Sequence, residues 1–146
     1  MGVSRGSGAA PGALSGTTTI ATGSSARGVC ISADGASVYA ANVSASTVSI
    51  FTRNTSTGAL SGTTTIATGS SPFGVCISAD GKNVYATNNA SSTVSIFTRN
   101  TSTGALSGTT TIATGSFPVG VCISADGKNV YAANSGGATV SIFTRS

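Results

Sequence analysis

Short runs of β-branched, aromatic and small polar residues follow one another along most of the chain. In the middle of the sequence four such runs cover residues 59–68, 74–79, 83–88 and 92–99. Apolar residues do not recur at helical spacing in any of them, and Val, Ile, Thr, Tyr and Phe favour extended backbone. The pattern therefore predicts four short β-strands and no helix in this part of the chain.

Turn residues separate these runs. An Asp80-Gly81 pair joins the second run to the third, and this pair tolerates positive φ at both central positions of a tight hairpin. The second and third strands are therefore expected to be antiparallel. Segments rich in Gly, Pro, Asn and Ser at 69–74, 88–91 and 100–104 separate the other strands.

The whole pattern is repeated three times. The block GALSGTTTIATGS begins at Gly12, Gly58 and Gly104, a constant spacing of 46 residues. A fixed period of this size with four short strands matches one blade of a β-propeller. The sequence therefore divides into a Gly- and Ser-rich leader, expected to be a flexible extension or an added start, and three repeats, at 1–11, 12–57, 58–103 and 104–146.

Both faces of the predicted strands carry small or apolar residues. In one strand Val75 and Ile77 alternate with Cys76 and Ser78, and no charged face is present. Such a sheet needs a cover on each side. Four-stranded sheets stacked around an axis meet this need, so the fold class is all-β, with three four-stranded propeller blades per chain.

The segment 72–89, followed by 92–97, resembles the YVTN-type β-propeller repeat, which is close to the lactonase-type propellers. The motif that names the repeat stands here as Val84-Tyr85-Ala86-Thr87-Asn88, with similar residues at 38–42 and 130–134. The resemblance covers nearly everything after residue 11. It implies the strand order d-abc, so that the chain opens with an outer strand at 12–23 and closes with an incomplete blade.

This strand order leaves the last predicted strand without a neighbour. Three blades are also fewer than the four to eight of closed propellers. We therefore expect the first strand, with Thr17 and Thr19, to pair with the last strand of a second chain, with Val140 and Ile142. The expected assembly is a homodimer that closes a six-bladed ring by strand exchange.

The composition leaves little chemistry. Charged residues make up 7% of the chain and aromatic residues 5%, His and Trp are absent, and the net charge of +4 is spread along the sequence. We therefore expect no nucleic acid partner and, without a run of about 18 apolar residues, no membrane partner. The family resemblance implies a metal or an acid and base at the axis. The only carboxylates, however, are Asp34, Asp80 and Asp126, each in an Asp-Gly turn, so we expect no enzyme, no metal site and no cofactor.

The cysteines are a second candidate for chemistry. Cys30, Cys76 and Cys122 occupy the same place in each repeat, and in a six-bladed ring they would place six thiols at similar radius. Such a set could bind a soft metal. We favour a packing role, because metal-binding cysteines normally lie at short sequence spacings.

Polar residues give two weaker candidates. Thr triplets at 17–19, 63–65 and 109–111 suggest a hydroxyl array that binds ice or glycans, but Thr also suits a solvated outer strand, which we favour. Glycosylation sequons begin at Asn42, Asn54, Asn89 and Asn100. Modification would require export, and the leader lacks the apolar core of a secretory signal. The compartment stays open, although the family resemblance leans towards the cell surface or the extracellular space.

The repeats differ most just before the second run of each copy. Arg27, Phe73, Phe117 and Val119 lie in this variable segment. Loops at one end of a propeller often form its binding face, so these residues are candidates for contact with a glycan or another surface ligand. Drift in a tolerant loop explains the variation equally well, and the sequence leaves both interpretations open.

Together these features predict a non-catalytic, self-assembling propeller scaffold, amplified or engineered from one repeat. The alternative is a cell-surface or extracellular binding or adhesion module that uses the loop face. A degenerate lactonase-like enzyme is the least favoured interpretation.

Overall fold

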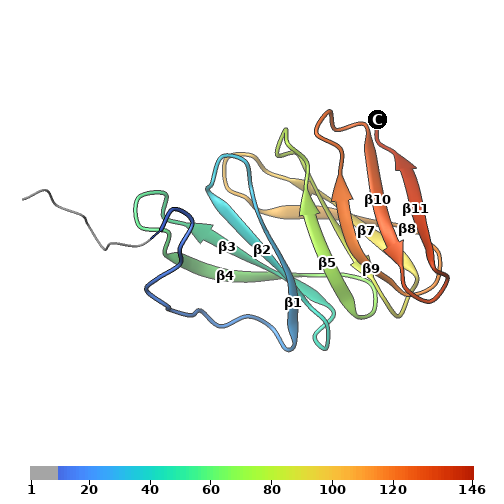
Figure 1. The fold of residues 1–146 in the computed structure, drawn as a ribbon, viewed down its shortest axis with the longest axis horizontal. Coiled ribbons are helices and arrows are strands. Elements are labelled where there is room, and N and C mark those ends of the chain that lie inside the picture. The colour runs from blue at the N-terminus through green and yellow to red at the C-terminus, as the bar shows by residue number, and fades with distance from the viewer. Residues whose placement is uncertain (1–9) are drawn as a thin grey trace, which may run out of the picture.

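The computed structural model describes residues 10–146, so most of the predicted leader at 1–11 lies outside the described residues. The described residues form eleven β-strands (Figure 1), and no helix among them is long and apolar enough to cross a membrane. The strands are β1 (Ala26–Ile31), β2 (Ser37–Asn42), β3 (Thr47–Arg53), β4 (Leu60–Ala67), β5 (Pro72–Ile77), β6 (Asn83–Asn88), β7 (Thr93–Arg99), β8 (Leu106–Ala113), β9 (Pro118–Ile123), β10 (Asn129–Asn134) and β11 (Thr139–Thr144).

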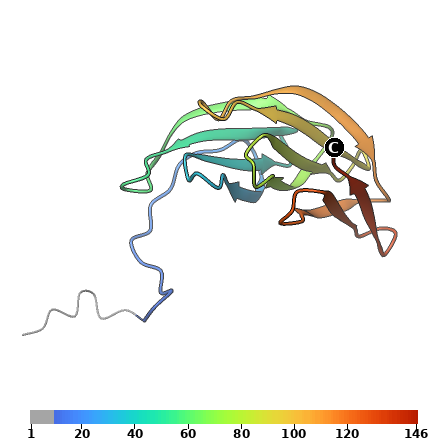
Figure 2. The ribbon, with the colours of Figure 1, turned by 90° about the horizontal axis from the view of Figure 1, so that it is seen from above.

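The strands form three antiparallel sheets. Two sheets have four strands, in the orders β1-β2-β3-β4 and β5-β6-β7-β8, and the third has the order β9-β10-β11. Figure 2 shows the sheets following one another along an arc. This arrangement confirms the predicted all-β propeller blades. The described part of the third blade has three strands, since no described residue pairs with the outer edge of β11.

The Asp-Gly hairpins differ in detail from the prediction. Gly81 has φ of +73°, but Asp80 is not among the residues with positive φ. The N–H of Gly81 donates to the carbonyl of Ser78 at 2.9 Å, which closes a four-residue turn ahead of the glycine. Only the glycine therefore needs the left-handed conformation, and the antiparallel pairing of β5 with β6 is as predicted.

The first strand of each sheet lies beside its counterpart in the next sheet (β1, β5 and β9 in Figure 1). Two glycines make this approach possible. A Cβ atom added to Gly28 would lie 2.5 Å from the carbonyl oxygen of Phe73, and one added to Gly74 would lie 2.5 Å from the carbonyl oxygen of Val119. The inner strands therefore pack backbone against backbone, as expected near the axis of a propeller.

Side chains from neighbouring sheets share one core. Between the first two sheets Tyr39, Phe97 and Leu106 are buried together with Val84. The Tyr39 hydroxyl donates to the carbonyl of Gly104 at 2.6 Å. A face of a sheet is therefore buried by the neighbouring sheet and not by its own strands. A sheet with a neighbour on each side needs apolar residues on both faces.

A buried arginine links the same two sheets. The Arg99 Nε atom donates to the Tyr39 hydroxyl at 2.6 Å, and its Nη2 atom donates to the Ser37 hydroxyl at 2.9 Å. The carbonyl of Gly81 accepts from Nη1 at 3.2 Å. Arg99 is 4% exposed, and these contacts satisfy the polar atoms of its side chain inside the core.

The predicted first strand has no partner within its own chain. Residues 12–23, expected to be an outer strand in a blade of a second chain, are exposed up to Thr22 and form no strand with the described residues. The outer edges of β3 and β7 are already paired with β4 and β8. Figures 1 and 2 show residues 10–23 running away from the first sheet, on the side opposite to β11. Thr17 and Thr19 therefore do not meet Val140 and Ile142 within one chain.

The contact between inner strands leads to a first prediction. Gly74→Ala places a methyl group against the backbone of β9, so we expect the free energy of unfolding to fall by about 1–3 kcal/mol. Chemical denaturation measures this change. The matched control is Gly137→Ala, because a Cβ atom there makes only ordinary contacts and the first repeat carries Ala45 at the equivalent position. Equal stability of the two variants would contradict the close packing of the inner strands.

Candidate functional site

The starts of the inner strands bring together three of the candidate binding residues. Arg27, Phe73 and Val119 are the second residues of β1, β5 and β9. The guanidinium carbon of Arg27 lies 5.4 Å from the centroid of the Phe73 ring, which is a cation–π contact. The strands lie side by side, so these positions share one end of the molecule.

Hydrogen bonds from the second blade hold this end in place. The Thr87 hydroxyl donates to the carbonyl of Val119 at 2.7 Å and accepts from the N–H of Gly74 at 2.9 Å. Thr87 is fully buried and replaces an alanine, Ala41 or Ala133, of the other repeats. It joins β6 to the start of β9, next to the ring of Phe73.

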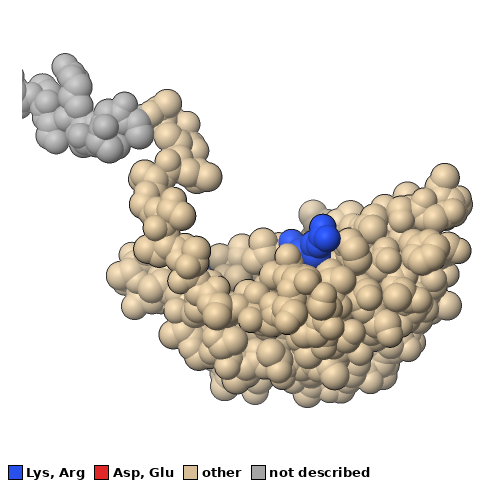
Figure 3. Space-filling view, turned by 90° about the horizontal axis from the view of Figure 1, so that it is seen from below, with Lys and Arg blue, Asp and Glu red and all other residues tan. Residues whose placement is uncertain are grey.

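This end of the molecule carries the positive charge of Arg27. Arg27 is exposed and forms no ion pair with a described residue. Figure 3 looks onto the end at which β5 and β9 begin, the lower end in Figure 1, and the face shown carries one small basic patch. An exposed guanidinium above an aromatic ring can bind an anionic group while the ring contacts an apolar face of the same ligand.

Phe117 does not join this pair. It precedes β9, has φ of +54° and is 52% exposed. Its ring covers Gly136, where an added Cβ atom would collide with it. The equivalent residues, Ser25 and Ser71, also have positive φ, so the aromatic side chain occupies a turn position that the other repeats fill with serine.

The three carboxylates serve the hairpin turns. Each Asp accepts a hydrogen bond from a Ser hydroxyl two residues earlier and from a backbone N–H two residues later. For Asp80 the Ser78 hydroxyl, followed by the Arg145 guanidinium at 2.8 Å, holds the pKa well below its usual range. Hydrogen bonds from the Ser hydroxyls also lower the pKa of Asp34 and of Asp126, so all three groups are ionised acceptors at neutral pH.

The cysteines lie on the inner strands. Cys30 and Cys76 are half-buried and Cys122 is exposed. Among residues 10–146 no group of three or more His, Cys, Asp or Glu side chains is close enough to hold a metal ion. The burial of Cys30 and Cys76 against the two inter-sheet cores is consistent with the packing role.

Three buried asparagines were not recognised as a set from the sequence. Asn42, Asn88 and Asn134 end the second strand of each blade, and their side-chain amides donate to a Thr and a Ser hydroxyl on the next strand. Their Oδ1 atoms have no partner among the described residues. The signal was their recurrence at one repeat position. Asn42 is fully buried, so its sequon is inaccessible in the folded chain.

The residues expected to close the ring are separated in the chain. Thr17 and Thr19 are exposed in the extended segment, and Val140 and Ile142 are 56% and 70% exposed on β11. Their exposure leaves both surfaces open to solvent.

Comparison with known proteins points to one family. The family "Lactonase, 7-bladed beta-propeller" matches residues 8–77 and, again, residues 67–146. No curated protein matches the chain.

Several solved structures are similar to this chain. A protein from Bacteroides fragilis, provisionally assigned as a 6-phosphogluconolactonase, has 28% identity and a TM-score of 0.79, over 88% of this chain and 37% of its own. A similarly assigned protein from Bacteroides uniformis has 25% identity and a TM-score of 0.79, over 87% of this chain and 38% of its own. The periplasmic gluconolactonase of Pseudomonas aeruginosa shares the fold at 22% identity, with a TM-score of 0.76 over 85% of this chain and 36% of its own. This chain therefore spans less than two-fifths of the length of these proteins.

These findings correct the functional prediction. The sequence favoured a non-catalytic scaffold and no enzyme, because acid and base residues are scarce. The lactonase family match and the lactonase assignments of the similar structures contradict both statements. The scarcity of titratable residues was a poor guide to function. It is a property of this chain, whereas the comparison relates its blades to a family of lactonases.

The buried thiols give a second prediction. Burial raises the pKa of Cys30 and of Cys76 from 9.0 to about 12, which lowers the thiolate fraction at pH 8 about a thousandfold. We expect iodoacetamide to label both residues at least about 100-fold more slowly in the native chain than in the denatured chain. Peptide mapping by mass spectrometry measures each rate. Native labelling as fast as denatured labelling would show that the two thiols are not packed between the sheets.

Proposed function

Because the chain belongs to the lactonase family of seven-bladed β-propellers, we propose that it forms part of a propeller that hydrolyses a lactone. The observation that carries this proposal is the family match, which extends over both halves of the chain. The basic and aromatic end of the inner strands supports it by offering a place for substrate near the axis.

The proposed substrate is a sugar lactone with an anionic group. The Arg27 guanidinium is exposed, and it can donate two parallel N–H bonds to a phosphate or carboxylate. The Phe73 ring lies 5.4 Å below it and offers an apolar surface to the sugar ring. The names of the Bacteroides proteins include a 6-phospho group, which is an anion of the kind that Arg27 would bind.

The proposed reaction adds water to the carbonyl carbon of the lactone and breaks the bond between that carbon and the ring oxygen. The product is a hydroxy acid, and one proton is released at neutral pH. Arg27 and Phe73 would bind and orient the substrate, and such positioning contributes to the rate because it fixes the carbonyl relative to the attacking water. Thr87 would act as a positioning residue, since it ties the blades together beside Phe73.

The third prediction tests this binding role. We expect the chain to hydrolyse 6-phosphogluconolactone above the uncatalysed rate, and Arg27→Ala to raise KM about 10- to 100-fold, since a hydrogen bond to a charged group is lost. The effect on the neutral glucono-lactone should stay within about threefold. Proton release in a pH-stat measures both reactions.

The matched control is Lys128→Ala, which removes the same charge from an exposed side chain in a hairpin turn. It should leave KM for both lactones unchanged. Absence of hydrolysis above the background rate by the 146-residue chain would overturn the proposed function. An equal effect of the two substitutions would overturn the role of Arg27 alone.

A further inference from the structure

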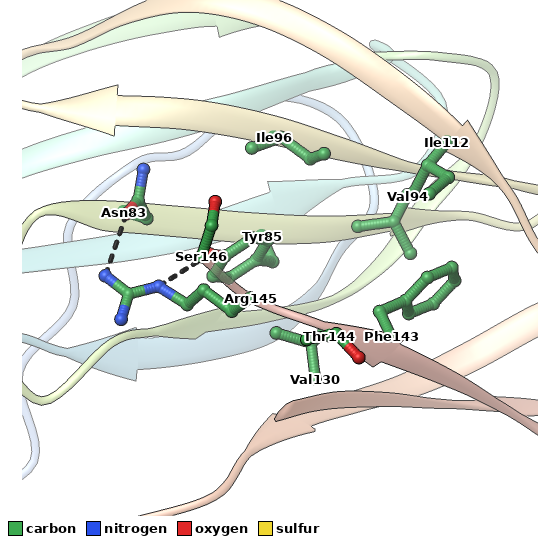
Figure 4. A pocket seen from close by; sticks show the side chains of 10 residues that line it. All are labelled: Asn83, Tyr85, Val94, Ile96, Ile112, Val130, Phe143, Thr144, Arg145 and Ser146. Carbon is green, nitrogen blue, oxygen red and sulfur yellow. Dashed lines mark hydrogen bonds between the residues drawn. The ribbon is translucent and has the colours of Figure 1, made fainter. Parts of the chain in front are cut away.

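An apolar cleft lies between the second and third blades. Its volume is about 230 Å³, and it is open to solvent. Figure 4 shows Val94, Ile112 and Phe143 at one end of the cleft and Asn83 and Arg145 at the other. The cleft thus has an apolar half and a polar half.

The equivalent space between the first two blades is filled. Leu106, at the start of β8, inserts there and is 8% exposed, and the carbonyl of Gly104 accepts a hydrogen bond from the Tyr39 hydroxyl. Between the second and third blades Tyr85 takes the place of Tyr39. Its hydroxyl accepts from the Arg145 Nε atom at 3.0 Å but donates to no described residue. The cleft is therefore the site of one leucine and one carbonyl that an outer strand of the third blade would supply.

Two apolar positions that the first two blades bury are exposed around the third blade. Val94 on β7 is 1% exposed because it packs against the third sheet, whereas the equivalent Val140 on β11 is 56% exposed and has no described sheet beside it. Ile66 is half-buried against the first core, whereas its counterpart Ile112 is 44% exposed at the cleft. Both differences expose apolar surface where the first two blades bury it.

The segment 12–23 has the sequence of the missing strand, and its two glycines have matching φ values. Its residues are identical to 58–69 and to 104–115, which contain β4 and β8. Gly12 and Gly16 have φ of +84° and +68°, against +81° and +65° for Gly58 and Gly62. Its two turn glycines therefore have the φ values that they have beside β4 and β8, while Leu14 is 98% exposed.

The segment does not reach the cleft of its own chain. Its end is tied to the first blade, where the N–H of Gly23 donates to the Ser49 hydroxyl at 3.3 Å. The cleft and β11 lie at the other end of the arc of blades (Figures 1 and 2). The chain that can receive the segment is therefore a second copy.

We propose that residues 12–21 of one chain add to β11 of a second copy as the fourth strand of its third blade. The register follows from β7 and β8, in which Arg99 lies opposite Leu106 and Val94 opposite Ile112. By the same spacing, Leu14 lies opposite Arg145, and Ile20 opposite Val140. Leu14 fills the cleft, and the carbonyl of Gly12 accepts from the Tyr85 hydroxyl.

Two such exchanges make the contact reciprocal, so that each chain donates one strand and receives one. A two-fold axis relates the copies, which is the most frequent symmetry of homo-oligomers. The exchange pairs the open edge of β11 and buries Leu14 in the cleft beside Ile112. It does not depend on the proposed lactone hydrolysis.

Leu14→Asp tests the exchange. Leu14 contacts almost nothing within its own chain, so the substitution should not disturb the fold of a single chain. At a concentration at which both proteins are monomeric, the variant and the unsubstituted protein should have the same far-ultraviolet circular dichroism spectrum and melting temperature. We expect the dissociation constant of the dimer to rise at least about 100-fold, because a charged carboxylate replaces a buried leucine. Light scattering on a sizing column at two concentrations measures the mass.

The matched control is Ser15→Asp. The equivalent serines, Ser61 and Ser107, are exposed on β4 and β8, so this charge should face solvent in the assembly and leave the dissociation constant within about threefold. The exchange is supported if the unsubstituted protein has the mass of two chains, or forms a series of larger assemblies, and if Leu14→Asp but not Ser15→Asp reduces this mass to that of one chain. One chain for the unsubstituted protein at the higher concentration, or equal masses for both variants, would overturn it.

A cross-link tests the register separately. By the spacing of Ser107 and Thr98, Ser15 of one copy lies opposite Thr144 of the other. The double variant Ser15→Cys with Thr144→Cys should form a disulfide-linked dimer on mild oxidation, visible on a non-reducing gel. Ser15→Cys with Thr98→Cys is the control, because Thr98 already pairs within its own chain. Equal cross-linking of both pairs would overturn the proposed register.

Discussion

The structure depends on the burial of two apolar faces by each sheet, because no sheet can cover its own faces. Tyr39, Phe97 and Leu106 come from two blades and meet only between them. The buried Arg99 links the same blades through the Tyr39 hydroxyl. Stability is therefore a property of neighbouring pairs of blades, as in other repeat proteins, and any face without a neighbour exposes apolar surface. The face of the third sheet that carries Val140 and Ile142 has no described neighbour, and these side chains are 56% and 70% exposed.

The same constraint explains where a site can form. Backbone contacts at Gly28 and Gly74 bring the inner strands so close together that only backbone and small residues fit between them. Arg27 and Phe73 stand next to these glycines and meet at the starts of the strands. The packing of the inner strands thus places one charged and one aromatic side chain in contact at an end of the molecule, where a ligand can reach residues of several blades.

Much of the fold could be predicted from the sequence, because its signals are local and repeated three times. The runs at 74–79 and 83–88 became β5 and β6, and the Asp80-Gly81 turn joined them as expected. The segment 12–23 is not a strand within its own chain, because strand formation needs a partner edge, and the edges of β3 and β7 are already paired. The pairing of Arg27 with Phe73 also needed the structure, since these residues are 46 positions apart and meet only when the inner strands lie side by side. The sequence analysis ranked a lactonase-like enzyme last, because the residue types of this chain offer little acid–base chemistry, whereas the lactonase family is shown by comparison with relatives.

Repetition separates the residues that hold the fold from those that can recognise a ligand. Positions that are identical in all repeats, such as Cys30, Cys76 and Cys122, produce the same surface on every blade. The proposed substrate, a sugar lactone, has no such symmetry, so only positions at which the blades differ can fix its orientation. Arg27, Phe73 and Val119 occupy one such position, and Thr87 replaces alanine beside them. This position carries a charge in the first blade, an aromatic ring in the second and an aliphatic side chain in the third. The three blades therefore offer different contacts, as the binding of an asymmetric substrate in one orientation requires.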